Sequence, residues 1–260
     1  MKNRRLLSQK NQTIVIAFLC EGLILLPSKA FAGPPWNVDD PGTTPFRHTI
    51  AYLSYSSSRL GNNRTDSLPS LGVTYGLTDR SELGFGFGAL IASTANGGTD
   101  YGFGDSAVSL KHRFVDQGNL QVAIAYQATF PTGASSKRLG SGAVDQGTWL
   151  TASYQLGKFQ VAANAGLNAF GSGTRRDSPL YGVVGLCQVS PNTQVGVQVY
   201  GDGPKFTGDH GELAYGVGAT HDLSAGRRLQ AQVGRSLRGK SDLNLYLGMT
   251  IEYGSRRDRK

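Results

Sequence analysis

The sequence lacks long apolar runs, and this absence excludes a membrane protein built from spanning helices. Its 260 residues are 39% hydrophobic, with a mean hydropathy of −0.25, whereas each spanning helix needs about twenty consecutive apolar residues. The main apolar stretch, residues 14–26, is shorter than that and contains Glu21. A β-barrel needs apolar residues only at alternate positions, so its mean hydropathy stays modest.

Cysteine and net charge are also scarce in the part of the chain expected to fold. The sequence has only Cys20 and Cys187, and removal of Cys20 with a signal peptide would leave no partner for an intrachain disulfide. Residues 1–32 carry half of the formal net charge of +8, and the basic tail carries most of the rest. The remaining body is close to neutral, so the basic pI predicts no nucleic-acid partner.

The first thirty-two residues have the pattern of a signal peptide. Four basic residues precede the apolar stretch, and Ala30-Phe31-Ala32 supplies a small-x-small cleavage site, which predicts a mature start at Gly33. An uncleaved anchor helix is disfavoured because the apolar run is short. A lipid anchor at Cys20 is disfavoured because the bulky Leu19 precedes it.

From Phe46 onward, strand-length segments with period-two apolarity alternate with turn residues. In one segment Leu83, Phe85 and Phe87 alternate with Gly84 and Gly86, so one face is apolar and the other is small or polar. The strands predicted in this way are 46–58, 67–77, 80–93, 103–114, 119–130, 147–156, 158–170, 179–189, 193–201, 211–222, 228–237 and 242–253.

The connections alternate between short turns and longer polar loops, which is typical of outer-membrane barrels with periplasmic turns and external loops. The longer loops are predicted at 59–66, 94–102, 131–146, 171–178 and 202–210. We therefore expect an all-β fold: a transmembrane, antiparallel, up-and-down β-barrel of about twelve strands in the bacterial outer membrane. A soluble β-sandwich or lipocalin-like barrel is the alternative, but it would place the apolar face inside.

This interpretation divides the chain into four parts and predicts a monomer. They are a signal peptide (1–32), an N-terminal periplasmic or lumen-entering segment (33–45), the barrel (46–253) and a basic tail (254–260). The last strand resembles the C-terminal assembly signal of outer-membrane proteins, through Tyr246, Gly248, Ile251 and Tyr253. The lipid bilayer and the barrel assembly machinery are the expected partners, although the tail continues beyond the usual end of that signal.

Several ordered motifs resemble the outer-membrane family named for a MetA-type meta-pathway of phenol degradation, whose members are often described as transporters. The motifs are Asp39-Asp40-Pro41-Gly42-Thr43, Gly102-Phe103-Gly104-Asp105, Lys111-His112-Arg113-Phe114, Phe130-Pro131-Thr132-Gly133 and Leu139-Gly140-Ser141-Gly142. The resemblance covers residues 37–170 best and implies a barrel that passes small, often aromatic, molecules. Fold-level resemblance alone does not identify the solute.

Charged residues on the polar strand faces are the candidates for a lumen lining. They would either select solutes electrostatically or form internal ion pairs that brace or plug the lumen; interleaved signs favour the second. Asp39 and Asp40 could bind a cation, but an N-terminal segment tucked into the barrel mouth is favoured. The candidate lining residues are Arg47, Glu82, Asp105, Lys111, Arg113, Lys158, Glu212, Arg228 and Glu252.

The predicted function is passive passage of a small, aromatic or hydrophobic solute, with no catalytic residue, cofactor or metal. The alternatives are an outer-membrane lipid hydrolase and a structural or adhesive barrel. A hydrolase needs a nucleophile beside a base, and the only cluster that suggests one is Asp209-His210-Gly211-Glu212. Loop 131–146 and segment 33–45 are predicted to limit diffusion, so deletion of 134–144 should raise flux.

Overall fold

The computed structural model describes residues 35–94, 97–239 and 241–254. The predicted signal peptide (1–32) and all of the predicted tail except Gly254 lie outside this range. Among the residues described, no helix is long and apolar enough to cross a membrane. The described chain forms thirteen strands and one 3-10 turn: β1 (Thr49–Leu60), β2 (Asn63–Thr78), β3 (Ser81–Ser93), β4 (Thr99–Phe103), β5 (Ser106–Gln117), β6 (Leu120–Phe130), η1 (Ser135–Lys137), β7 (Asp145–Leu156), β8 (Phe159–Phe170), β9 (Ser178–Ser190), β10 (Thr193–Asp202), β11 (Glu212–Ser224), β12 (Arg227–Arg238) and β13 (Leu243–Tyr253).

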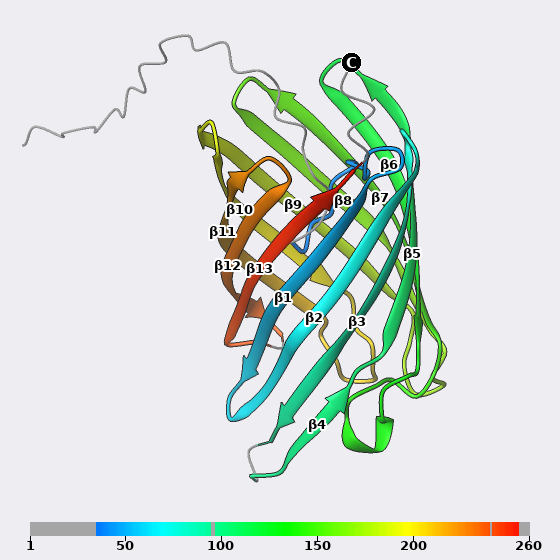
Figure 1. The fold of residues 1–260 in the computed structure, drawn as a ribbon. Helices are drawn as coiled ribbons and strands as arrows, with labels where there is room; N and C mark the ends of the chain where they lie inside the picture. The colour runs from blue at the N-terminus through cyan, green and yellow to red at the C-terminus, as the bar shows by residue number, and fades with distance from the viewer. Residues whose placement is uncertain (1–34, 95–96, 240, 255–260) are drawn as a thin grey trace, which may run out of the picture.

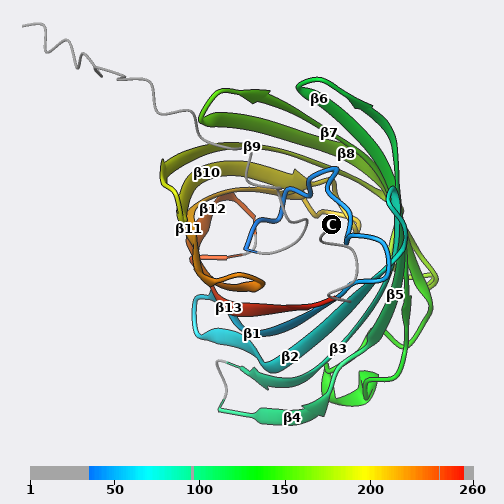
Figure 2. The same ribbon diagram turned by 45° about the horizontal axis from the view of Figure 1, so that its top comes forward.

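Twelve of these strands close into one antiparallel barrel (Figures 1 and 2). The first and last strands join, with Thr49 opposite Tyr253 and Arg59 opposite Leu243. Pairing of β2 with β3 completes the ring, whereas β4 pairs only with the distal half of β3 and extends as a hairpin. Closure pairs the twelve barrel strands with one another around the ring, which a sheet within a membrane requires.

The alternation of side chains sets which face of the wall meets lipid. On β8, Phe159, Val161 and Leu167 point outward and are about half exposed, whereas Gln160 and Asn164 are buried in the lumen. The other strands follow the same alternation, and the outward set is mostly aliphatic and aromatic. Such a surface is stable against acyl chains rather than water, so the fold is a transmembrane barrel of the outer membrane.

The two ends of the barrel differ in the length of their connections. The turns at 79–80, 118–119, 157–158, 191–192 and 225–226 are two residues long, and Gly118, Gly157 and Gly226 have the positive φ that such tight turns require. The chain enters β1 and leaves β13 at this same end, the upper end in Figure 1. It is therefore the periplasmic end.

Two details of the predicted strands are wrong. The predicted loop 59–66 is a two-residue turn, because β1 continues to Leu60 and β2 begins at Asn63, with Gly61 at a φ of 56°. The predicted loop 94–102 contains most of β4. Both errors lie at the external ends of strands. In residues 59–66 the apolar alternation that identifies a strand disappears, whereas β4 is only five residues long and keeps just Tyr101 and Phe103 of that pattern.

Candidate functional site: a segment docked in the lumen

Residues 35–48 run inside the barrel near its periplasmic end and cross from the β9–β10 wall to the β2–β3 wall (Figure 2). Val38 packs with Ala162 and Val184 in a cluster whose members are 1–6% exposed. Gly182 makes room for this contact, since a Cβ there would come within 2.6 Å of Val38 Cγ2. Small residues of the wall thus leave the space in which the segment packs.

The backbone of the segment is held at the same wall by Gln198 of β10. The Oε1 of Gln198 accepts hydrogen bonds from Asn37 N (2.9 Å) and Val38 N (3.1 Å). Gln198 is 1% exposed, so removal of its amide would leave two backbone donors without this partner.

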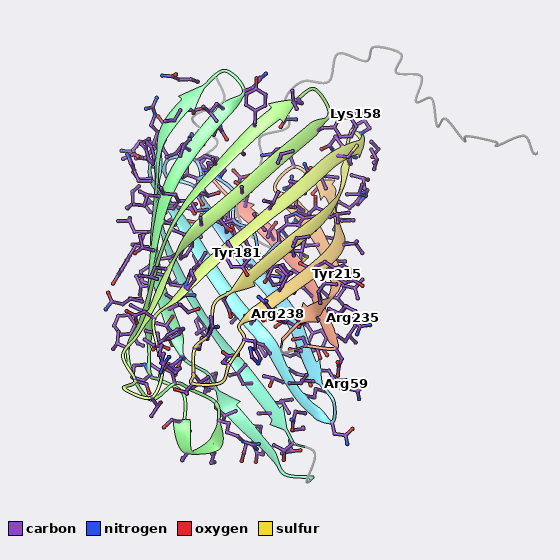
Figure 3. All side chains as sticks on the ribbon, turned by 180° about the vertical axis from the view of Figure 1, so that it is seen from behind. Arg59, Lys158, Tyr181, Tyr215, Arg235 and Arg238 are labelled. Carbon is purple, nitrogen blue, oxygen red and sulfur yellow. The ribbon has the colours of Figure 1, made fainter. Side chains whose placement is uncertain are left out.

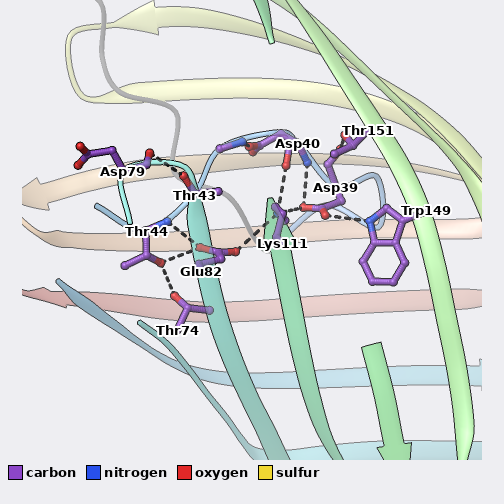
Figure 4. A network of polar contacts seen from close by, with 11 residues as sticks. Asp39, Asp40, Thr43, Thr44, Thr74, Asp79, Glu82, Lys111, Trp149 and Thr151 are labelled. Carbon is purple, nitrogen blue, oxygen red and sulfur yellow. Dashed lines mark hydrogen bonds and ion pairs between the residues drawn. The ribbon is translucent and has the colours of Figure 1, made fainter. Parts of the chain in front are cut away.

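An ion pair between Asp39 and Lys111 of β5 forms the centre of the site (Figure 4). Lys111 Nζ donates to Asp39 Oδ1 (2.6 Å) and to the carbonyl of Asp40 (3.1 Å). The other carboxylate oxygen of Asp39 accepts from Trp149 Nε1 (2.9 Å), and its carbonyl accepts from Thr151 Oγ1 (2.7 Å). Strands β5 and β7 therefore clamp one residue of the segment.

Glu82 of β3 holds the second half of the segment through Thr44. Glu82 Oε2 accepts from Thr44 N (2.6 Å) and Thr44 Oγ1 (2.8 Å), and Thr44 Oγ1 also contacts Thr74 Oγ1 of β2 (2.6 Å). Glu82 Oε1 lies 3.8 Å from Lys111 Nζ. One ammonium thus links the two carboxylates that anchor the segment.

Asp40 is the unfavourable member of this group. It adds a third carboxylate near Lys111, and its Oδ1 accepts a hydrogen bond from Gly42 N (2.6 Å). Desolvation inside the lumen raises the pKa of Asp40, and this effect outweighs the Lys111 ammonium, which lowers it. The docked segment would therefore be more stable with Asp40 neutral.

The structure brings only two of the nine candidate lining residues together, namely Glu82 and Lys111. Four others are distributed near the periplasmic end. Arg113 pairs with Asp116 (3.2 Å), Glu252 with His48 (2.6 Å) and Arg228 with Asp222, while Lys158 lies in the 157–158 turn rather than in the predicted strand 158–170.

The remaining three candidate lining residues make contacts elsewhere in the chain. Asp105 accepts hydrogen bonds from Gly133 N (3.0 Å) and Ser141 N (2.7 Å), which fasten loop 131–144 to the wall. Glu212 accepts from Ser236 at the external end. Arg47 has a φ of 61° and lies over the Phe46 ring, outside the strands.

Four wall residues that contact the segment were not predicted from the sequence, namely Gln198, Trp149, Thr151 and Thr74. Their local pattern gives no signal, because glutamine, tryptophan and threonine are ordinary residues on an inward strand face. The contacts join residues 30–161 positions apart, and only the closed barrel brings them together.

The histidines form no triad or metal site within the described residues. No group of three or more His, Cys, Asp or Glu side chains there could hold a metal ion. The Asp209 carboxylate accepts hydrogen bonds from the backbone N–H groups of Lys205 and Gly211, so it stabilises the loop that contains it. His112 contacts Ser81 (2.9 Å) across two strands, and the described chain places no carboxylate in hydrogen-bonding contact with that ring.

These features define an outer-membrane β-barrel whose lumen is occupied by its own N-terminal segment. Residues 89–244 match the model of the family described as "Putative MetA-pathway of phenol degradation". The match covers more than half of the sequence, so the chain belongs to this family, which confirms the resemblance found in the motifs. No curated protein matches the sequence.

Solved barrels share the fold at low sequence identity. The KdgM porin has a TM-score of 0.55 and 9% identity, with 79% of this chain and 99% of that chain covered. The NanC porin has a TM-score of 0.54 and 7% identity, with 78% and 98% covered. The β domain of the Bordetella autotransporter BrkA has a TM-score of 0.52 and 12% identity, with 79% and 99% covered. At these identities the likeness establishes the barrel fold alone.

Proposed function

We propose that the protein is an outer-membrane channel for the passive passage of small molecules, narrowed at its periplasmic end by segment 35–48. The observation that carries this proposal is the way the segment is held: it crosses the lumen through hydrogen bonds, one ion-pair network and a small apolar cluster. None of these contacts is covalent. Undocking would widen the path without unfolding the barrel.

A cavity at the periplasmic mouth supports a path beside the docked segment. Its volume is about 360 Å³, and it lies among β1, β11, β12 and β13, away from the contacts of Lys111 and Glu82. Its lining includes Ile50, Thr250, Glu252 and the Arg228–Asp222 pair.

The solute class that the lumen favours is small and uncharged. Channels that select ions use rings of like charge, whereas here Arg228 and Lys111 on the inward face and Arg175 in the β8–β9 loop each pair with a carboxylate. The family description refers to phenol degradation, so small neutral aromatic molecules are the first class to test. The KdgM porin structure that contains oligogalacturonate has a TM-score of 0.53 at 9% identity, which does not transfer that solute to this chain.

We propose that the protein is not an enzyme. Asp209 is engaged by backbone donors, and the described part of the chain gives the Ser81–His112 pair no carboxylate that would orient the imidazole of a triad. A lipid-hydrolysis assay of the folded protein, with Ser81→Ala and His210→Ala as variants, tests this. Lipid turnover that either variant abolishes would establish the hydrolase alternative.

We also propose that cleavage after Ala32 produces a monomeric mature chain, which the barrel assembly machinery inserts through its C-terminal strand. In that strand the Tyr246 ring lies against Gly248 in the lumen, and Ile251 and Tyr253 belong to the outward set by alternation. The intact mass of the protein isolated from outer membranes tests the cleavage site.

Single-channel recording in planar bilayers tests the channel. Discrete conductance steps that neutral phenols block more strongly than aromatic acids support both the channel and its solute class. A folded, heat-modifiable barrel that stays silent even after the segment is released would contradict the proposal and favour a structural role.

A further inference from the structure

A row of outward-facing residues near the external rim combines arginine with tyrosine on the lipid side of the wall. Tyr215 of β11 pairs with Arg235 of β12. The last β12–β13 pair is Gly234 with Asn244, so one further residue places Arg235 beside Leu243, which pairs with Arg59 of β1. Adjacent strands lie about 4.8 Å apart, so the two arginine backbones are about 10 Å apart.

Both arginines are exposed, and within the described residues neither has an ion-pair partner. Arg238 adds a third exposed guanidinium at the end of β12. Figure 3 shows Arg59, Arg235 and Arg238 on one side of the barrel, below Tyr215 and Tyr181 and far from Lys158 in its periplasmic turn. The neighbouring Arg64, in contrast, is neutralised by Asp66 at 2.8 Å.

The surroundings of Arg235 identify its environment as the membrane interface. Along β12 it shares the outward face with Val233 and Leu237, which are 43% and 64% exposed. A charged side chain on this face is destabilising at the bilayer midplane and tolerated near the headgroups, where it can extend to a polar partner. Tyrosine is enriched at the same level.

We propose that Arg59, Arg235 and Arg238 form a binding site for the phosphate groups of an outer-leaflet lipid, of the diphosphorylated lipid A type. The guanidinium fork matches phosphate oxygens in a bidentate geometry. Three cations that have no carboxylate partner among the residues described complement a lipid that carries two phosphates. The acyl chains of such a lipid would lie along the apolar outward residues of β11–β13. The proposed ligand is therefore a membrane lipid rather than free phosphate.

Native mass spectrometry of the full, folded chain in a neutral detergent tests this site by titration with diphosphoryl lipid A. The double variant Arg59→Gln/Arg235→Gln should weaken binding at least tenfold, since each charge-assisted hydrogen bond contributes about one power of ten. Arg227→Gln is the matched control, because Arg227 is exposed at the periplasmic end of the same strand. It should leave binding unchanged.

Three outcomes would overturn the proposal. They are equal binding by the double variant and the control, equal binding of diphosphoryl and phosphate-free lipid A, and competition by inorganic phosphate at the same affinity as the lipid. Arg235→Lys should retain part of the affinity through its charge. Heat-modifiable migration of each variant establishes that the barrel is folded before binding is compared.

Discussion

Replacement of Lys111 by methionine should release segment 35–48 from the lumen. The substitution keeps an unbranched side chain as far as Cε and removes the ammonium that contacts Asp39 and Glu82. Removal of one partner from a buried ion pair costs about 3–5 kcal/mol. The side chains of Lys111 and Asp39 are 9% and 18% exposed, so some solvent screening remains and we take the lower value, about 3 kcal/mol. This corresponds to about a hundredfold shift toward the undocked state.

A thiol at position 38 reports this shift directly. Val38 is 2% exposed when the segment is docked, so Val38→Cys should react with a maleimide only after undocking. In a mature chain whose Cys187 is replaced by serine, Lys111→Met should raise the reaction rate about a hundredfold and raise channel conductance in parallel. Asp39→Asn combined with Lys111→Met should recover part of the protection, because one uncompensated charge is removed. An unchanged labelling rate in folded Lys111→Met protein would refute the ion pair as the tether.

Three further predictions use the same labelling and conductance assays. Asp40→Asn should strengthen docking. Because the pKa of Asp40 is raised in the docked state, docking favours its protonated form, so the gain in docking over the native protein should grow as pH rises above the ordinary Asp pKa of 3.8. A gain in docking that does not change with pH would contradict this. Gly182→Leu should expose position 38 while leaving the barrel heat-modifiable, since its Cβ would already meet Val38 at 2.6 Å; retained protection would show that the wall can yield. Deletion of 134–144 should raise solute flux less than Lys111→Met does, because Leu139 and Asp105 fasten this loop to the β3–β4 side of the barrel. Unchanged solute flux would exclude the loop as a constriction.

The architecture could be predicted from the sequence because lipid imposes one rule on the whole wall. Any strand that crosses acyl chains must place an apolar residue at every second position, so Phe85 and Phe87 or Phe159 and Val161 identify strands without tertiary information. The rule fails where the wall leaves the membrane. Residues 59–66 contain arginine, asparagine, threonine and aspartate on both faces, so the ends of β1 and β2 in this range were predicted as a loop.

The docking of the N-terminal segment could be predicted only in outline. Alternation places Lys111 and Glu82 inward, and the placement of two acidic residues just before the first strand suggests a segment near the barrel mouth. The specific pairing does not follow from this pattern. Asp39 and Lys111 are 72 residues apart in sequence, and Asp39 could equally face any inward cation until the order and register of the strands bring β5 and β7 to it.

The two faces of β13 provide a final prediction that connects wall orientation to function. Leu247 points outward, is 48% exposed and lies at the middle of its strand, so Leu247→Arg places a charge near the bilayer midplane. The expected loss in the free energy of unfolding is about 2–4 kcal/mol, measured by urea titration of the protein in lipid vesicles. Thr250 lies on the opposite face and lines the periplasmic cavity. Thr250→Arg should therefore fold with nearly native stability and shift the channel toward anions, because the added charge lies in the proposed solute path rather than in lipid. If the two substitutions destabilise the barrel equally, residue 250 does not face water, and the cavity cannot be the periplasmic end of the path.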